Sequence, residues 1–215
     1  MCRLYTLRAP RNILAGIFGV EFPVLDKSLF RTTNTVVAVR RTNDQREAAT
    51  FHWGLIPPKA KDKKEASGKV NARADTVAEL SSYRVPFRRR RCLMPADGFY
   101  EYKEIGKKRE PHYFEMADGA LFAFAGIWEI WSPKDQPAIE SCSMITTEPN
   151  ELVGQFHDRM PVILPRETWD HWLSETEDAN ELTPLLVAYP SELMREQLVD
   201  SPLKKATPKV RTLFD

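Results

Sequence analysis

The chain has 215 residues, of which 42% are hydrophobic and 28% are charged, so it can bury the core of an ordinary globular protein. Lysine and arginine number 31 against 30 aspartates and glutamates, which gives a net charge of +1. A charge this small excludes long-range attraction of the whole protein to nucleic acid or membranes. The cysteines, Cys2, Cys92 and Cys142, form no C-x-x-C pair. Their spacing argues against a disulfide framework or a zinc ribbon and favours a reducing compartment.

The first twenty residues combine arginines with the apolar run ILAGIFGV at residues 13–20. A secretory signal shares these features, but the run is short and no small-residue cleavage site follows it. We therefore predict a buried amphipathic helix here. No stretch approaches the roughly 18 apolar residues of a membrane span, so we expect a cytoplasmic protein that does not contact membranes.

The middle of the chain is rich in patterns typical of strands. Strands are predicted at residues 34–41, 49–58, 91–104, 112–116, 121–131 and 140–148, with a loop at 59–69. The spacing of Ala and Leu between residues 75 and 83 predicts a short helix. Asp118-Gly119, between two alternating runs, predicts a hairpin turn.

The last third of the chain favours helices. Residues 149–156 indicate a helical turn, residues 165–173, 180–186 and 191–199 are helical or mixed, and the last dozen residues form a tail with lysines and proline. Because strands dominate the middle and helices flank them, the predicted fold class is α+β, with a mostly antiparallel, β-barrel-like core. We expect a single domain over residues 1–215, ending in the tail.

Four segments occur in an order and spacing more specific than any one of them. They are MC at residues 1–2, NARAD at 71–75, PADGFYEYKE at 95–104 and HDRMPVIL at 157–164, and WGLIP at 53–57 and RRRRCLMPADG at 88–98 fit the same pattern. Over roughly residues 1 to 165 the chain resembles the SRAP family, the SOS response-associated peptidases. The resemblance implies an SRAP-like domain that senses abasic sites in single-stranded DNA and crosslinks to them through an N-terminal cysteine. It also implies self-processing peptidase or lyase-like activity.

Removal of Met1 would give Cys2 two adjacent nucleophiles, a thiol and a free α-amine. The resemblance implies this removal, by self-processing or by an aminopeptidase. An α-amine has a pKa of about 7.7–8.0, so it can form a Schiff base with the aldehyde of an opened abasic sugar. The thiol can then close a thiazolidine ring, which requires an exposed aminothiol. From its position alone, Cys2 is more simply interpreted as a small hydrophobic residue that starts a strand.

The same motifs contain further candidate catalytic residues. Asn71 offers an uncharged amide that can hold the thiol or the amine. Glu101 lies among aromatic residues, which favours a raised pKa and a role as the acid that opens the sugar ring. Without the resemblance, an exposed carboxylate on the outer face of a strand is the simpler interpretation. His157 can shuttle a proton near neutral pH or simply cap a turn. We assign no chemistry to the remaining histidines, His52, His112 and His171.

Binding DNA requires cations and surfaces for stacking. Arg73 and Arg159 lie inside the motifs and are the candidate phosphate ligands, with Arg3 a weaker one. Trp53 either stacks on a base or packs in the core. The run at residues 88–91 and the lysines of 59–64 are accessories at most, because charge runs are usually solvated. We expect the partner to be single-stranded DNA with abasic sites. The protein is expected to be a monomer that needs no obligatory protein partner, cofactor or metal and is nucleoid-associated when it is bound to DNA.

The sequence departs from the family pattern on surfaces that face DNA. Arg3 and Leu4 follow Cys2 where many members have glycine, residues 29–39 lack a proline, residues 58–62 lack a tryptophan, and Asp75 stands where glutamate is common. Other hypotheses therefore stay open. One is an N-terminal-nucleophile hydrolase, and another is a non-covalent nucleic-acid-binding module in which Cys2 is structural. A metal site built from the three cysteines and a histidine is disfavoured by their scattered spacing.

Overall fold

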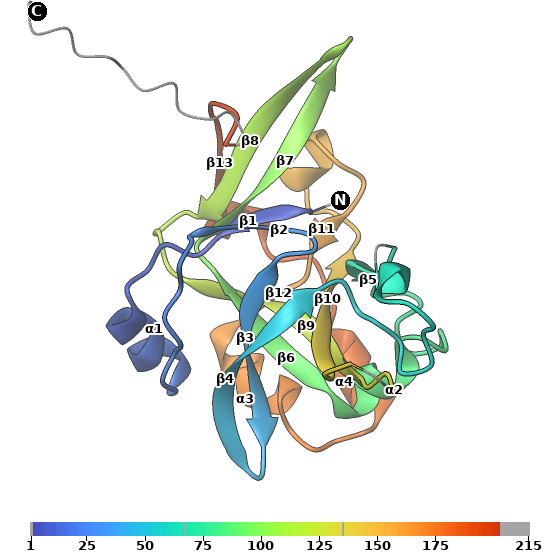
Figure 1. Cartoon of the computed structure of the whole chain (residues 1–215). Coiled ribbons are helices and arrows are strands. Elements are labelled where there is room, and N and C mark those ends of the chain that lie inside the picture. Colours follow the sequence, from blue (N-terminus) through green and yellow to red (C-terminus); the bar gives the residue numbers. More distant parts are fainter. Residues whose placement is uncertain (1, 67, 135, 203–215) are drawn as a thin grey trace, which may run out of the picture.

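The structure is a computed structural model that describes residues 2–66, 68–134 and 136–202. Its centre is a closed barrel of five strands in the order β10, β4, β3, β6, β9, with β9 paired to β10 (Figure 1). Neighbouring strands are antiparallel except β4 and β10, which are parallel. The barrel strands are β3 (Thr35–Thr42), β4 (Gln45–Trp53), β6 (Arg91–Ala96), β9 (Phe122–Trp131) and β10 (Ile139–Thr147).

Short helices lie outside the barrel. In α1, Leu14 and Phe18 are buried, which confirms the predicted amphipathic helix, and Phe18 stacks on Trp169 of α3 with ring centroids 4.6 Å apart. No helix in the described residues is long and apolar enough to cross a membrane. The α-helices are α1 (Arg11–Phe18), α2 (Arg84–Arg89), α3 (Trp169–Trp172) and α4 (Ala179–Leu182). Single 3-10 turns are η1 (Lys63–Ala66), η2 (Val153–Gln155), η3 (Arg166–Thr168), η4 (Thr183–Leu185) and η5 (Ser191–Leu193).

A second antiparallel sheet packs beside the barrel, in the order β13, β8, β7, β1, β2. Its strands are β1 (Leu4–Thr6), β2 (Leu29–Arg31), β7 (Gly98–Ile105), β8 (Lys108–Met116) and β13 (Met194–Leu198). The β7–β8 hairpin turns at Gly106, whose φ of 60° suits glycine, and extends away from the barrel (Figure 1). Tyr5 of β1 lies opposite Phe99 of β7. The residues before β1 therefore run alongside the part of β7 that carries Glu101.

Three short strands extend the edges of the barrel. They are β5 (Asn71–Arg73), β11 (Met160–Pro161) and β12 (Ile163–Leu164). Strand β5 runs parallel to the end of β10, and β11 runs antiparallel to the same end, so both pair with Thr146. Two motifs that are far apart in the sequence, at residues 71–75 and 157–164, are thereby joined through β10.

The predicted α+β class with a barrel-like, mostly antiparallel core is confirmed, and strands occupy the predicted central runs. Residues 91–104, however, form two strands, β6 and β7, in different sheets. Three further local predictions are wrong. Residues 75–83 form turns that follow β5, which ends at Arg73, and the helix begins only at Arg84. Asp118-Gly119 does form a turn, but the strands that it joins, β8 and β9, lie in different sheets and do not form a hairpin. The turn residues alone do not determine which strands pair. Residues 194–198 form β13, an edge strand on β8. The predicted tail lies outside the described residues.

Candidate functional site

A cleft of about 790 Å³ lies between β7 and the segment that follows η2. Glu101 and His157, two of the predicted catalytic residues, both line it, together with Phe156. Cations at its rim come from Arg3 and Arg109. The cleft therefore combines a carboxyl group, an imidazole and positive charge within one concave surface.

Cys2 lies directly beside this cleft and is completely buried. Its carbonyl oxygen accepts a hydrogen bond of 2.9 Å from Nδ2 of Asn71, and its Sγ donates to the carbonyl oxygen of Leu4 at 3.7 Å. Burial raises the pKa of the thiol well above its ordinary value, and the negative charge of Glu101 acts in the same direction. The thiol is therefore protonated at neutral pH, and Asn71 fixes the backbone of Cys2 rather than its side chain.

The expectation of an exposed aminothiol is wrong for the chain that carries Met1. Cys2 belongs to the same apolar cluster as Tyr5 and Phe99, because β1 enters the core immediately after it. The simpler interpretation, a small hydrophobic residue at the start of a strand, describes this state of the protein.

Glu101 points inward from β7 and is 4% exposed. An exposed carboxylate on the outer face of the strand is therefore the wrong interpretation. Burial raises the pKa of Glu101, since the ionised carboxylate is poorly solvated among apolar neighbours. A carboxyl group with this property can hold a proton closer to neutral pH and donate it to a substrate.

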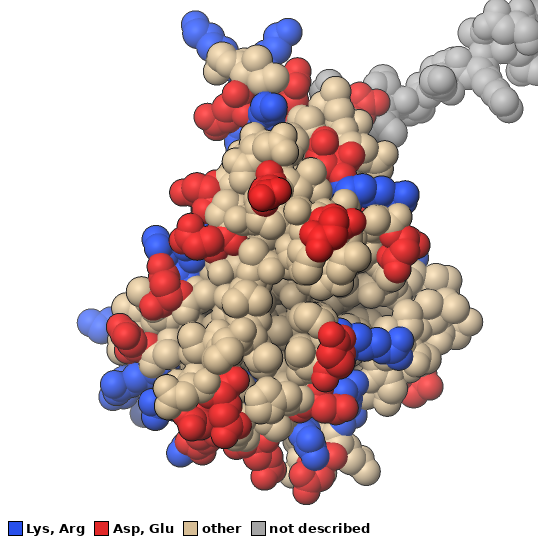
Figure 2. All heavy atoms as spheres, turned by 180° about the vertical axis from the view of Figure 1, so that it is seen from behind, with Lys and Arg blue, Asp and Glu red and all other residues tan. Residues whose placement is uncertain are grey.

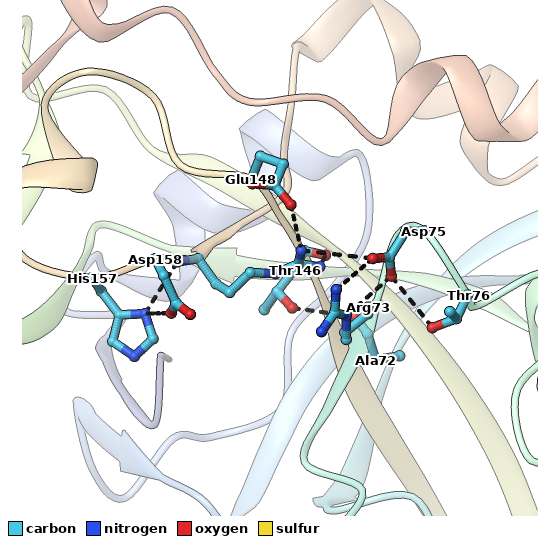
Figure 3. Close-up of polar contacts among 9 residues, drawn as sticks. Ala72, Arg73, Asp75, Thr76, Thr146, Glu148, His157 and Asp158 are labelled. Carbon is cyan, nitrogen blue, oxygen red and sulfur yellow. Dashed lines mark hydrogen bonds and ion pairs between the residues drawn. The ribbon is translucent and has the colours of Figure 1, made fainter.

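His157 lies after η2, where its backbone N–H donates to the carbonyl oxygen of Val153 at 3.0 Å. Its Nδ1 accepts from the backbone N–H of Arg159 at 3.1 Å and also lies 2.7 Å from Oδ1 of Asp158 (Figure 3). A neutral Nδ1 suits the first contact and a protonated Nδ1 suits the second. Burial lowers the pKa of His157 and the charge of Asp158 opposes this. The net lowering favours the neutral ring, which can accept a proton.

The candidate phosphate ligands form one polar cluster with two acids (Figure 3). Arg159 is 8% exposed at its side chain and donates to Oε1 of Glu148 at 2.9 Å and to the carbonyl oxygen of Thr146 at 3.1 Å. Arg73 is exposed and binds Asp75 through Nε at 3.1 Å and Nη2 at 2.5 Å. Each arginine is therefore already neutralised by a carboxylate. The sequence patterns do not predict the role of Glu148, although its position just after β10 could have indicated it.

The other predicted DNA-binding residues divide between surface and core. Arg3 is exposed at the cleft. Trp53 is fully buried, its Nε1 donates to the carbonyl oxygen of Val70 at 2.9 Å, and its ring contacts Tyr5. Trp53 therefore presents no face to a base, and core packing is the interpretation that the structure supports.

The arginine run at residues 88–91 is not a uniform basic surface. Arg91 is buried, and its guanidinium donates to backbone carbonyl groups, among them those of Phe87 and Trp172. Arg90 pairs with the buried Glu129. Elsewhere, on the face in Figure 2, acidic and basic side chains are interspersed. These features leave the end of β10 and the rim of the cleft as the candidate positions for a bound polyanion.

The three cysteines do not gather into a metal site. All are buried and free, and no group of three or more His, Cys, Asp or Glu side chains within the described ranges could hold a metal ion.

Comparison with known proteins gives consistent matches over nearly the whole chain. The family model of the SOS response associated peptidase (SRAP) matches residues 1–206. The chain is 38% identical over 211 residues to the abasic site processing protein YoaM of Bacillus subtilis, covering 94% of this chain and 92% of that protein. It is 30% identical over 159 residues to the abasic site processing protein HMCES of Gallus gallus, covering 63% of this chain and 47% of that one.

Solved structures agree with this fold. A crystal structure of a protein from Bacteroides thetaiotaomicron has a TM-score of 0.84 and 28% identity, covering 92% of both chains. A protein from Bordetella bronchiseptica has a TM-score of 0.83 and 28% identity, covering 93% of this chain and 100% of that one. The barrel and the second sheet are therefore shared with experimentally determined structures.

Proposed function

Because the chain belongs to the SOS response associated peptidase family, as its motifs indicated, we propose that it senses abasic sites in single-stranded DNA and captures them covalently. The capture uses Cys2 after Met1 has been removed, and the protein acts as a cytoplasmic monomer. The names of the relatives, abasic site processing proteins, support the class of substrate. The observation that carries the proposal is the juxtaposition of Cys2, held by Asn71, with a cleft lined by Glu101 and His157.

The first chemical step is the opening of the abasic sugar. Glu101 donates its proton to the ring oxygen, the bond between that oxygen and C1 breaks, and His157 takes the proton of the C1 hydroxyl group. The products are an aldehyde at C1, an ionised Glu101 and a protonated His157. The raised pKa of Glu101 and the lowered pKa of His157 support these roles, since the first shift favours a protonated acid and the second favours a neutral base.

The second step joins the protein to C1. The α-amine of Cys2 attacks the aldehyde carbon, one amine proton passes to Glu101, and His157 gives its proton to the carbonyl oxygen, which forms a carbinolamine. Glu101 then donates its proton to the hydroxyl group, which leaves as water, and His157 takes the second amine proton, which leaves a neutral imine. The resulting imine is attacked by the thiol: the S–C bond forms, the S–H bond breaks, and its proton goes to the imine nitrogen. A five-membered thiazolidine results. Asn71 supports ring closure because its bond to the carbonyl oxygen of Cys2 restrains that backbone.

The test is a crosslinking assay with single-stranded DNA that carries one abasic site. We expect a heat-stable adduct from the wild-type protein and none from Cys2→Ala. Cys2→Ser keeps the amine, so it should form only an adduct that requires borohydride reduction to survive heating. Cys142→Ala is the matched control, because it removes a buried thiol away from the cleft and should keep the adduct.

Intact-protein mass spectrometry accompanies the assay. It reports whether the wild-type chain begins at Cys2, and a Glu101→Gln chain that retains Met1 would favour self-processing over an aminopeptidase. No adduct from a wild-type chain that begins at Cys2 would contradict the proposal. Equal binding of intact DNA by wild type and Cys2→Ala, without adduct, would indicate a non-covalent binding module. Hydrolysis of peptides in trans would indicate a hydrolase.

A further inference from the structure

A histidine to which the sequence assigns no chemistry lies beside Glu101 on the neighbouring strand. Glu101 of β7 and His112 of β8 are directly opposite each other in the hairpin register. Directly opposed residues project from the same face of a sheet, with Cβ atoms about 4.5–5.5 Å apart. Both are buried, with 4% and 8% of their surface exposed. His112 is therefore an inward-facing neighbour of the proposed catalytic acid.

The other side of the His112 ring is held by a second carboxylate. Nδ1 of His112 contacts Oε1 of Glu196, which lies on β13 at the edge of the sheet. A carboxylate at Nδ1 favours the tautomer whose proton is on Nδ1, so that Nε2 carries a lone pair. Nε2 is buried and has no hydrogen-bond partner in the described part of the chain. It is therefore a buried acceptor on the strand that neighbours Glu101.

The face of the ring is also fixed. Phe156, which lines the cleft and immediately precedes His157, packs on His112 with ring centroids 4.5 Å apart. One imidazole thus touches the segment that carries the proposed base and stands opposite the residue proposed as the acid.

We propose that His112, oriented by Glu196, is a positioning residue for Glu101. Its Nε2 accepts a hydrogen bond from the protonated carboxyl group and so keeps Glu101 in the acid form until the sugar ring oxygen takes the proton. This inference rests on the proposed function. No bond to carbon forms or breaks at His112, and its Nδ1 proton stays between the ring and Glu196.

The charges around Glu101 come from several elements. Cys2 precedes β1, Arg109 lies on β8 with His112, and Asp158 follows His157. Of these, Arg109 favours the ionised carboxylate and Asp158 disfavours it. The charged groups that face His112 are Glu101 from β7 and Glu196 from β13, and its third neighbour, Phe156, is uncharged. A change at Glu196 therefore alters the ring tautomer without touching the other charges near Glu101.

The test compares single-turnover crosslinking rates across pH at saturating abasic DNA. Glu196→Gln can donate from its amide to Nδ1, which favours a proton on Nε2 and so stabilises ionised Glu101. His112→Asn keeps a donor toward Glu196 but lacks an acceptor at the position of Nε2. We expect both to crosslink about tenfold more slowly at neutral pH. The alkaline fall of the rate should also move to lower pH, with the Kd for intact single-stranded DNA within about twofold of wild type.

Two further variants sharpen the result. His112→Gln reaches the position of Nε2 with an amide oxygen and should crosslink faster than His112→Asn. Glu115→Gln is the matched control, because it breaks the 2.9 Å ion pair with Arg195 across the same two strands and should behave as wild type. If His112→Asn does not fold, Glu196→Gln, at the sheet edge, carries the test.

Rate losses that follow a lower melting temperature, with the pH profile unmoved, would overturn the inference and leave His112 as a packing residue. Wild-type rates and profiles in Glu196→Gln and His112→Asn would also overturn it. Failure of the proposed function is seen separately, as absence of any adduct from wild type, and overturns both proposals.

Discussion

The cleft and the arginine cluster at the end of β10 use opposite means to control charge. In the cleft, burial shifts the pKa of Cys2, Glu101 and His157, in each case in the direction that favours the neutral form. In the cluster, Arg73 and Arg159 keep their positive charge, which the carboxylates of Asp75 and Glu148 balance through ion pairs. Burial is insensitive to salt, whereas surface ion pairs are screened. We therefore expect the chemistry of capture and the affinity for DNA to respond to different substitutions.

The largest effect that separates the two regions is expected from Glu101→Gln. The amide cannot donate an acidic proton to the sugar, so the crosslinking rate should fall about 100-fold or more. The Kd for intact single-stranded DNA should not change, because a side chain that is 4% exposed does not contact phosphate. Single-turnover gels and fluorescence anisotropy measure the two quantities. Glu104→Gln, an exposed acid on the same strand, is the control. A loss of affinity alone would remove Glu101 from the acid role.

Within the cluster, Arg159→Met and Arg73→Met should differ. Arg159 is buried and donates to Glu148 and the Thr146 carbonyl group, so Met should lower the free energy of unfolding by about 1–3 kcal/mol and also weaken DNA binding. Arg73 is exposed, so its replacement should leave stability unchanged. If Arg73 contacts one phosphate, its loss should reduce the slope of log K against log salt by about 0.7. Urea unfolding and a salt series of binding isotherms measure these effects, and equal stability losses would contradict the distinction.

The sequence predicts the elements better than their partners. The strands of the barrel follow from apolar and alternating runs, because each strand must bury a face. Pairing is not local: Asp118-Gly119 makes a turn, but the strands on either side join different sheets. Residues 194–198 form β13 because β8 leaves an edge beside it. The helical or mixed sequence pattern of these residues carries no information about the free edge of β8.

The candidate site shows the same division. The motifs place Asn71, Glu101 and His157 in the chain, and the structure brings Asn71 to Cys2 and the other two to one cleft. The position of Cys2 at the start of a predicted strand suggests a small hydrophobic residue, whereas the resemblance suggests an exposed aminothiol, and only the entry of β1 into the core decides between them. The neighbours of the site, His112 and Glu148, come from cross-strand register and from the end of β10. Such relations exist only after strands have paired.

A third prediction uses the pH dependence of stability in the cleft. The pKa of Glu101 is raised in the folded state, so at pH values between the ordinary glutamate pKa and this raised value the folded protein holds more protons than the unfolded chain. Stability contributed by this group therefore falls as pH rises through that window. Glu101→Gln should gain stability over wild type as pH rises, and the gain should level off above the raised pKa. Urea unfolding from pH 4 to pH 8 measures the difference in the free energy of unfolding between Glu101→Gln and wild type. The lowered pKa of His157 contributes with the opposite sign, and this contribution cancels because both proteins contain His157. A difference that is independent of pH would contradict the raised pKa.

The smallest expected effect is at Glu148, whose side chain is 81% exposed while its partner Arg159 is 8% exposed. A phosphate that approaches Arg159 must compete with this carboxylate, so Glu148→Gln should tighten binding of intact single-stranded DNA by about two- to fivefold at low salt. The gain should disappear at high salt, where an exposed ion pair is already screened. The crosslinking rate at saturating DNA should stay at the wild-type value, because Glu148 does not line the cleft. Glu151→Gln, which removes an exposed charge a few residues away, controls for net charge. Weaker binding in Glu148→Gln would mean that the carboxylate orients Arg159 for phosphate instead of competing with it.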